Sequence, residues 1–70
     1  MITNTQIENS FTYHPPVGNQ QERYVALRNK AKDLALDIVN LTPSSREQSL
    51  AITRLEEAIM WANKAIACNE

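Results

Sequence analysis

Residues 41–48 read Leu-Thr-Pro-Ser-Ser-Arg-Glu-Gln, and this stretch decides the fold because it separates two long segments with helical periodicity. Proline disfavours a helical conformation in the residue before it, so we expect the upstream helix to end at Thr42-Pro43. Ser44 and Glu47 have the spacing of a capping box, which predicts that the downstream helix begins at Ser44 or Ser45. A connection this short makes the two helices antiparallel neighbours.

Both flanking segments carry apolar residues at steps of three or four, the spacing at which two helices pack along a common seam. The expected upstream seam consists of Tyr24, Leu27, Ala31, Leu34, Ile38 and Leu41. The expected downstream seam consists of Ile52, Leu55, Ile59, Ala62 and Ile66. The upstream helix should start near Asn19, because Asn19 and Glu22 are spaced as a second capping box. The sequence therefore predicts an all-α protein, with a long antiparallel helical hairpin over residues 19–70.

Residues 1–18, which we call the arm, are mostly polar and precede the hairpin within a single domain. The stretch from Phe11 to Pro16 should be extended, because each of its two prolines disfavours helix in the preceding residue. A short helical turn is expected near Thr5–Ser10. The predicted arm is thus extended or short-helical.

The hairpin has more apolar surface than one partner helix can cover. A 70-residue chain buries only about 60% of its unfolded surface, and its single cysteine, Cys68, rules out an intrachain disulfide. Apolar residues off the seam are Val25, Leu36 and Val39 upstream, and Ala51, Ala58, Ala65, Met60 and Trp61 downstream. Trp61 is expected in a core. A large exposed apolar patch marks an interface, so we expect a symmetric homo-oligomer.

Composition excludes several classes of function. The net charge is −1, from 7 basic and 8 acidic residues, which argues against a protein that binds duplex nucleic acid. The chain has no apolar run of membrane-spanning length and no signal-peptide pattern, so a soluble cytoplasmic protein is expected. His14 and Cys68 are single members of their types, which disfavours a metal site. No catalytic triad or phosphate-binding glycine loop is present, so neither an enzyme nor a cofactor is expected.

Two groups of residues suggest ligand contacts, and each has a structural alternative. Phe11, Tyr13 and His14 form either a lid that stacks on a base or a strap that plugs a groove. Arg28 and Lys32 lie four residues apart and share a helix face that either holds a phosphate or is solvated.

The remaining cations are similarly open to two interpretations. The positive charges of Lys30 and Lys32 are offset by the nearby carboxylates of Asp33 and Asp37, which is typical of a solvated face. Arg46 falls in the first helical turn, where the helix dipole disfavours a cation. An arginine at this position either contacts a ligand or a partner, or is an exposed residue with a small energetic cost. Arg54 is placed to pair with Glu57 or Glu47.

Residues 43–67, Pro-Ser-Ser-Arg-Glu-Gln-Ser-Leu-Ala-Ile-Thr-Arg-Leu-Glu-Glu-Ala-Ile-Met-Trp-Ala-Asn-Lys-Ala-Ile-Ala, resemble the C-terminal helix of the anti-CBASS sponge family of bacteriophages. That family shares a helical hairpin with the Thoeris anti-defence sponges. The upstream stretches 13–16, 23–24 and 27–32 agree with the resemblance, which covers roughly residues 11–68 and leaves out the extreme N-terminus.

The resemblance implies a small phage protein that assembles as a hexamer in the host bacterial cytoplasm. It implies binding of cyclic dinucleotides of the cGAMP type, and of cyclic trinucleotides in some members, without cleavage, so that CBASS signalling is blocked. By position, Tyr13 would stack on a base and Arg28 would meet a phosphate, with His14, Lys30 and Lys32 as secondary contacts. Arg46 and Arg54 would line a pocket near a symmetry axis. The competing interpretation is a helical protein–protein interaction module that binds through Val25, Leu36 and Val39.

Overall fold

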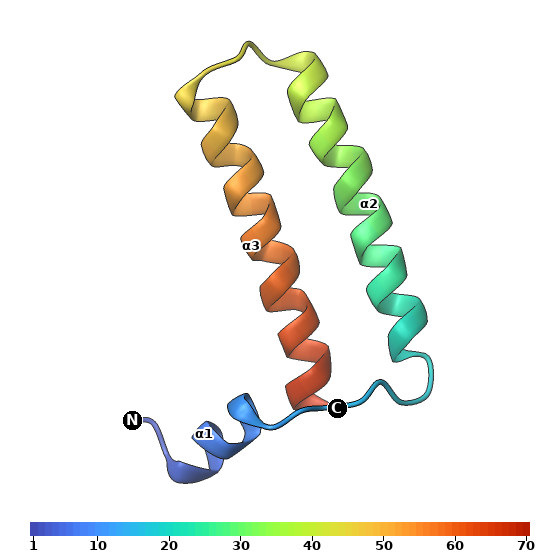
Figure 1. Ribbon diagram of the computed structural model, residues 1–70, viewed down its shortest axis with the longest axis vertical. Helices are drawn as coiled ribbons and strands as arrows, with labels where there is room; N and C mark the ends of the chain where they lie inside the picture. The colour runs from blue at the N-terminus through green and yellow to red at the C-terminus, as the bar shows by residue number, and fades with distance from the viewer.

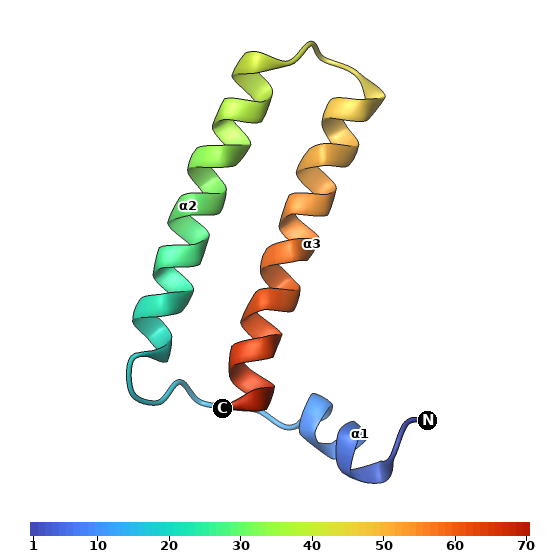
Figure 2. The same ribbon diagram turned by 180° about the vertical axis from the view of Figure 1, so that it is seen from behind.

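The computed structural model describes residues 1–70 and contains three helices and no strand (Figure 1). Helix α1 spans Asn4–Phe11, α2 spans Gln20–Leu41 and α3 spans Arg46–Asn69. Helices α2 and α3 run antiparallel side by side, and α1 lies at the open end of the hairpin on the side of α3 (Figures 1 and 2). The chain measures 44 × 31 × 14 Å along its principal axes. The predicted all-α hairpin is confirmed.

The connection between α2 and α3 is closed by side chains that cap both helix ends. Thr42 Oγ1 donates to the Ile38 carbonyl at 2.6 Å at the end of α2. Ser45 is the N-cap of α3, and its Oγ accepts from the Gln48 backbone N–H at 3.1 Å. Gln48 Nε2 in turn donates to the Thr42 carbonyl at 3.1 Å. Ser45 is therefore the correct start, whereas the expected pair of Ser44 and Glu47 was wrong by one residue.

The start of α2 is as expected, but its cap is not. Asn19 is the N-cap residue, yet its side chain makes no capping hydrogen bond, so the predicted box with Glu22 does not form. Gly18 precedes it with φ +56°, a left-handed conformation that glycine adopts without the usual steric cost. Gln20 is the one buried residue of the chain, and its Oε1 accepts from the Val17 N–H at 3.0 Å. The Gln20 side chain therefore bonds the end of the arm to the start of α2, and the N-cap residue of this helix makes no side-chain hydrogen bond.

The downstream seam is confirmed and the upstream seam shifts by one residue midway. All five predicted α3 positions are half-buried: Ile52, Leu55, Ile59, Ala62 and Ile66. On α2 the half-buried apolar positions are Tyr24, Leu27, Ala31, Ala35 and Ile38. Leu34 is 49% exposed and Leu41 is 82% exposed, so both were wrongly assigned to the seam. A straight helix of 3.6 residues per turn drifts away from a strict 3,4 repeat, which is why Ala35 takes the place of Leu34.

No hydrophobic residue of the isolated chain is fully buried. The off-seam residues Val25, Leu36 and Val39 are exposed, as the sequence predicted. The off-seam alanines of α3 are exposed as well: Ala51, Ala58 and Ala65. Trp61 is 62% exposed, so its expected place in a core is wrong for the single chain, because α2 packs on the opposite face of α3. The hairpin therefore presents apolar side chains on faces that no part of the chain covers.

The arm contains more helix than expected. Helix α1 begins after Thr3, whose Oγ1 accepts from the Gln6 N–H while Gln6 Oε1 accepts from the Thr3 N–H, a complete capping box. Phe11 is the last residue of α1, so its expected extended conformation is wrong. The segment from Thr12 to Asn19 is non-helical, and it passes the end of α3 to reach the start of α2 (Figures 1 and 2). No helix has the combination of length and apolar character that crossing a membrane requires.

Candidate functional site

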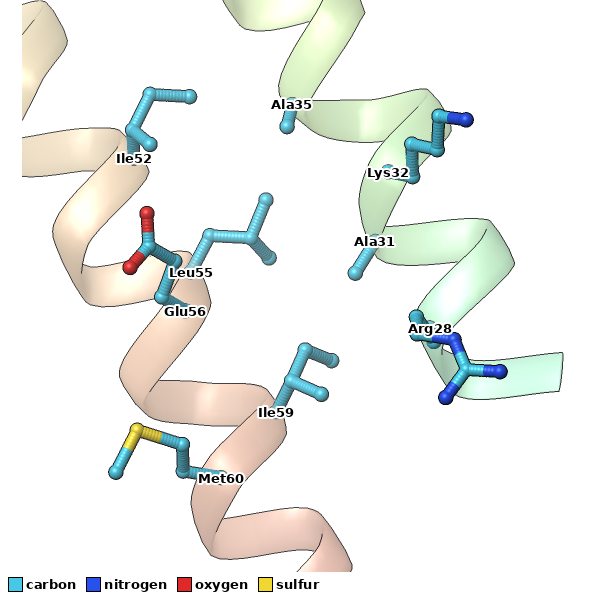
Figure 3. A pocket seen from close by; sticks show the side chains of 9 residues that line it. All are labelled: Arg28, Ala31, Lys32, Ala35, Ile52, Leu55, Glu56, Ile59 and Met60. Atoms are coloured by element: carbon cyan, nitrogen blue, oxygen red, sulfur yellow. The ribbon is translucent and has the colours of Figure 1, made fainter. Parts of the chain in front are cut away.

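An open apolar groove of about 400 Å³ runs between the middle of α2 and the middle of α3. Its volume is in the range of roughly 300–1,000 Å³ that is usual for small-molecule sites. Ala31 of α2 and Leu55 and Ile59 of α3 point toward one another across the gap between the helices (Figure 3). The groove is lined by Arg28, Ala31, Lys32, Ala35, Ile52, Leu55, Glu56, Ile59 and Met60.

Two cations stand at the rim of this groove. Arg28 and Lys32 both line it from α2, as their four-residue spacing predicted, and their charged ends point away from α3 (Figure 3). Neither is in an ion pair, since the two salt bridges of the chain are Arg23–Glu70 and Arg54–Glu57. Two unpaired cations beside an apolar floor can hold a phosphate while a flat base lies on the floor. Lys30 is exposed outside the groove.

The two arm aromatics project into solvent. Tyr13 is 80% exposed and Phe11 is 86% exposed, so neither plugs a groove of its own chain. Phe11 borders a shallow hollow of about 320 Å³ together with Lys64 of α3 and other residues of α1. Both rings are thus free to stack on a ligand or on another chain.

His14 has a structural partner. It is half-buried, and its Nε2 lies 2.7 Å from the carbonyl oxygen of Asn9. A carbonyl can only accept, so this nitrogen carries the proton and donates. The Nε2–H of His14 is therefore engaged within the arm, which leaves Nδ1 as the nitrogen free for a ligand.

The structure does not bring Arg46 and Arg54 near the arm within one chain. Arg46 is the first residue of α3 beside the turn, as predicted, while the arm lies at the opposite end of a 24-residue helix about 36 Å long. Arg54 Nη1 donates to Glu57 Oε2 at 3.0 Å, which confirms the expected pairing. A site that uses both the arm and Arg46 would need more than one copy of the chain.

Two features near the arm were missed by sequence reasoning. The Lys64 ammonium lies 5.5 Å from the centroid of the Trp61 ring, a cation–π contact. Both residues line a hollow of about 350 Å³ between α1 and the end of α3. Their spacing of three residues on a helix was a usable signal for the pair, but the position of α1 beside them was not encoded in any local pattern.

The second missed feature is an ion pair that closes the open end of the hairpin. Arg23 Nη1 donates to Glu70 Oε2 at 2.8 Å, its Nη2 bonds the other carboxylate oxygen, and Gln20 Nε2 donates to the same carboxylate at 3.4 Å. The hydrogen bonds from Arg23 lower the pKa of Glu70, and the same contact raises the pKa of Arg23. No group of three or more His, Cys, Asp or Glu side chains is arranged to hold a metal ion.

Residues 3–67 match the family model described as the Acb2/Tad1 hairpin domain. The match extends eight residues further toward the N-terminus than the resemblance seen in the sequence, so it includes the whole of α1. Neither a curated protein nor a solved structure matches the chain. Because the match covers most of the chain and the fold is the expected helical hairpin, this protein belongs to the Acb2/Tad1 hairpin family, the family of anti-CBASS and anti-Thoeris sponges.

Proposed function

We propose that this protein is a phage immune-evasion sponge that captures cyclic di- or trinucleotide signals in the host bacterial cytoplasm and holds them uncleaved. Its family is associated with sponge-type anti-defence and is not a known family of enzymes. Stoichiometric capture removes the signal from its receptor and so blocks CBASS signalling. A cGAMP-like cyclic dinucleotide is the proposed principal ligand.

The observation that carries this proposal is the pair of unpaired cations at the rim of the apolar groove. A cyclic dinucleotide is a ring of two phosphates that bears two flat bases, so it needs cations beside apolar or aromatic surface. Arg28 and Lys32 supply the charge, with Arg28 offering a two-pronged donor for phosphate oxygens. Tyr13 and Phe11, both exposed, supply the stacking surface.

Assembly is the second part of the proposal. No hydrophobic residue of the isolated chain is buried, and the exposed stripe of Val25, Leu36 and Val39 can be covered by another copy. A closed homo-oligomer, for which the resemblance suggests a hexamer, would bring the arm of one chain to the groove of another. It would also multiply the few cations of a chain whose net charge is −1. Copies of Arg46 and Arg54, with Lys30 and His14, are proposed as further contacts at the junctions.

The test is calorimetric titration of the purified protein with a panel of cyclic di- and trinucleotides. We expect one member to bind with nanomolar Kd, about −12 kcal/mol, at no more than one site per chain. Light scattering should give a mass at least twice the 7.9 kDa of one chain, and a mass of 7.9 kDa would contradict assembly. Mass spectrometry of the ligand released by heat should recover the intact ring. No binding by any member of the panel, or recovery of a linear product, would overturn the proposal.

A matched pair of variants tests the groove itself. Arg28→Gln removes a cation from the rim and should weaken binding by about 10- to 100-fold, the value of a charge-assisted hydrogen bond. Gln21→Glu lowers the net charge by the same one unit at an exposed position of α2 outside the groove, and it should leave the affinity within about twofold. Equal effects of the two substitutions would indicate a general charge effect and not a phosphate contact.

The exposed stripe also favours a second function, a helical module that binds another protein. An apolar stripe of Val25, Leu36 and Val39 suits a partner helix as well as it suits another copy. The arm discriminates between the two functions. A module would keep its partner after Tyr13→Ala, whereas a sponge would lose affinity for its nucleotide.

A further inference from the structure

Three residues form a polar cluster that joins the arm to the end of α3, and we call it the arm clamp. Asn9 Nδ2 donates to the Cys68 carbonyl oxygen at 2.9 Å, across 59 positions of sequence. The carbonyl oxygen of Asn9 accepts from His14 Nε2 at 2.7 Å and faces Cys68 Sγ at 3.8 Å. Asn9 is thus bonded through both its side chain and its backbone.

The clamp uses backbone carbonyls that the helices leave free. The last four carbonyls of an α-helix have no partner within the helix. Asn9 lies in the last four residues of α1, and Cys68 lies in the last four residues of α3. Both helix ends carry partial negative charge, so their approach is disfavoured unless donors lie between them. The Asn9 amide and the His14 ring provide those donors.

The arm has few other attachments. Among residues 1–18 only Asn9 and His14 are shielded from solvent, while every large apolar residue of the arm is exposed. A further hydrogen bond, from the Val17 N–H to Gln20 Oε1, holds the arm where it meets α2. Tyr13 lies between these two points of attachment, directly before His14 in the chain.

We propose that Asn9 is a positioning residue that fixes the arm and thereby presents Tyr13 to the cyclic nucleotide. This inference rests on the proposed sponge function. Asn9 does not touch the ligand: it holds the arm in the orientation from which the tyrosine ring can stack. The amide is required because its side-chain N–H donates to the Cys68 carbonyl at the end of α3, whereas the backbone carbonyl that accepts from His14 would be present with any residue at this position.

Population arithmetic gives the size of the effect. When only a fraction of molecules has the arm docked, the measured Kd rises in inverse proportion to that fraction. Loss of one neutral hydrogen bond shifts the docking equilibrium by about two- to tenfold. The affinity of an Asn9 variant should therefore fall by at most about tenfold.

The experiment compares Asn9→Ala with Asn4→Ala in the full chain. Asn4 is an exposed residue of the same helix, and its side chain makes no hydrogen bond, so it is a matched control. Asn9→Asp is a second variant, which keeps the shape of the side chain and removes its donor. Each protein is tested for chymotrypsin cleavage after Phe11 and Tyr13, for backbone ¹⁵N relaxation of residues 12–17, and for Kd with the cyclic dinucleotide that binds the wild type best.

For both Asn9 variants we expect faster cleavage, greater backbone motion and a Kd that is raised by up to about tenfold, with the mass and Tm of the hairpin unchanged. Asn4→Ala should match the wild type in every measurement. Wild-type cleavage and relaxation in the Asn9 variants would overturn the clamp. A mobile arm with an unchanged Kd would overturn its positioning role. If the wild type binds no cyclic nucleotide, the proposed function fails, and cleavage and relaxation alone then decide whether Asn9 holds the arm.

Discussion

The α2–α3 seam is held by apolar side chains, whereas the arm is held by hydrogen bonds: Asn9 donates to Cys68, His14 donates to Asn9 within the arm, and Val17 donates to Gln20. Apolar burial is not directional and accumulates along the whole length of two helices. A few hydrogen bonds contribute little net free energy, but they fix an orientation. This difference suggests that the seam supplies stability and that the arm supplies recognition. Substitutions in the two regions should therefore have separable effects.

The largest effect is expected from a charge in the seam. Ile59→Asp replaces an apolar side chain of the seam between α2 and α3 with a carboxylate and should cost on the order of 3 kcal/mol. A domain of this size has little more stability than that, so we expect loss of the helical circular dichroism signal at room temperature. Thr53→Asp is the control, because Thr53 is an exposed residue of the same helix. A folded Ile59→Asp protein would show that the seam is not the source of stability.

The next effect concerns the arm. Tyr13→Ala removes an exposed ring, so we expect no change in Tm but a loss of about 1–3 kcal/mol in cyclic dinucleotide affinity, the value of one base stacked on an aromatic ring. Val17→Ala, at another exposed apolar residue of the arm, should leave the affinity unchanged. Calorimetry and thermal melting on the same samples make the comparison. A lower Tm without loss of affinity would mean that Tyr13 belongs to the stabilising region.

The same difference explains which features could be predicted from the sequence. The seam repeats over many residues, so periodicity predicted two helices and all five α3 seam positions, and the short connection predicted their antiparallel order. The error at Leu34 and Leu41 arose because a 3,4 repeat approximates a helix of 3.6 residues per turn and the difference accumulates.

The arm was harder to predict because its contacts lie far apart in sequence. Asn9 and Cys68 are separated by 59 residues, and no local pattern distinguishes this asparagine from the others of the chain. The ion pair between Arg23 and Glu70 likewise depends on the two helix ends meeting. Among the predicted site residues, the shared face of Arg28 and Lys32 followed from helix geometry, whereas the engagement of His14 depended on the unforeseen end of α1.

A smaller effect is expected at the turn, where two adjacent serines provide a matched pair. Ser45→Ala removes the side-chain oxygen that caps α3 and should lower the free energy of unfolding by about 1 kcal/mol. Ser44→Ala should have almost no effect, because Ser44 is exposed and its side chain makes no hydrogen bond. Urea denaturation followed by circular dichroism measures both. A larger effect at Ser44 would place the cap at the residue first predicted from the sequence.

The smallest effect is expected at the open end of the hairpin, where Arg23 and Glu70 join the two helices by an exposed ion pair. The hydrogen bonds from Arg23 lower the pKa of Glu70 below its ordinary value of 4.5, so the folded state binds this proton more weakly than the unfolded state. A carboxylate of this kind stabilises the fold above pH 4.5, and its contribution is lost as the pH falls through the lower folded-state pKa. The Tm of the wild type should therefore exceed that of Glu70→Gln at neutral pH, and the difference should shrink as the solution is acidified.

High salt should shrink this difference in Tm as well, because both side chains are exposed and the ions screen their attraction. Thermal melts of the two proteins across this pH range isolate the pair, since every other carboxylate titrates in both. A constant difference in Tm at all pH values would show that Glu70 acts through its hydrogen-bonding shape and not through its charge.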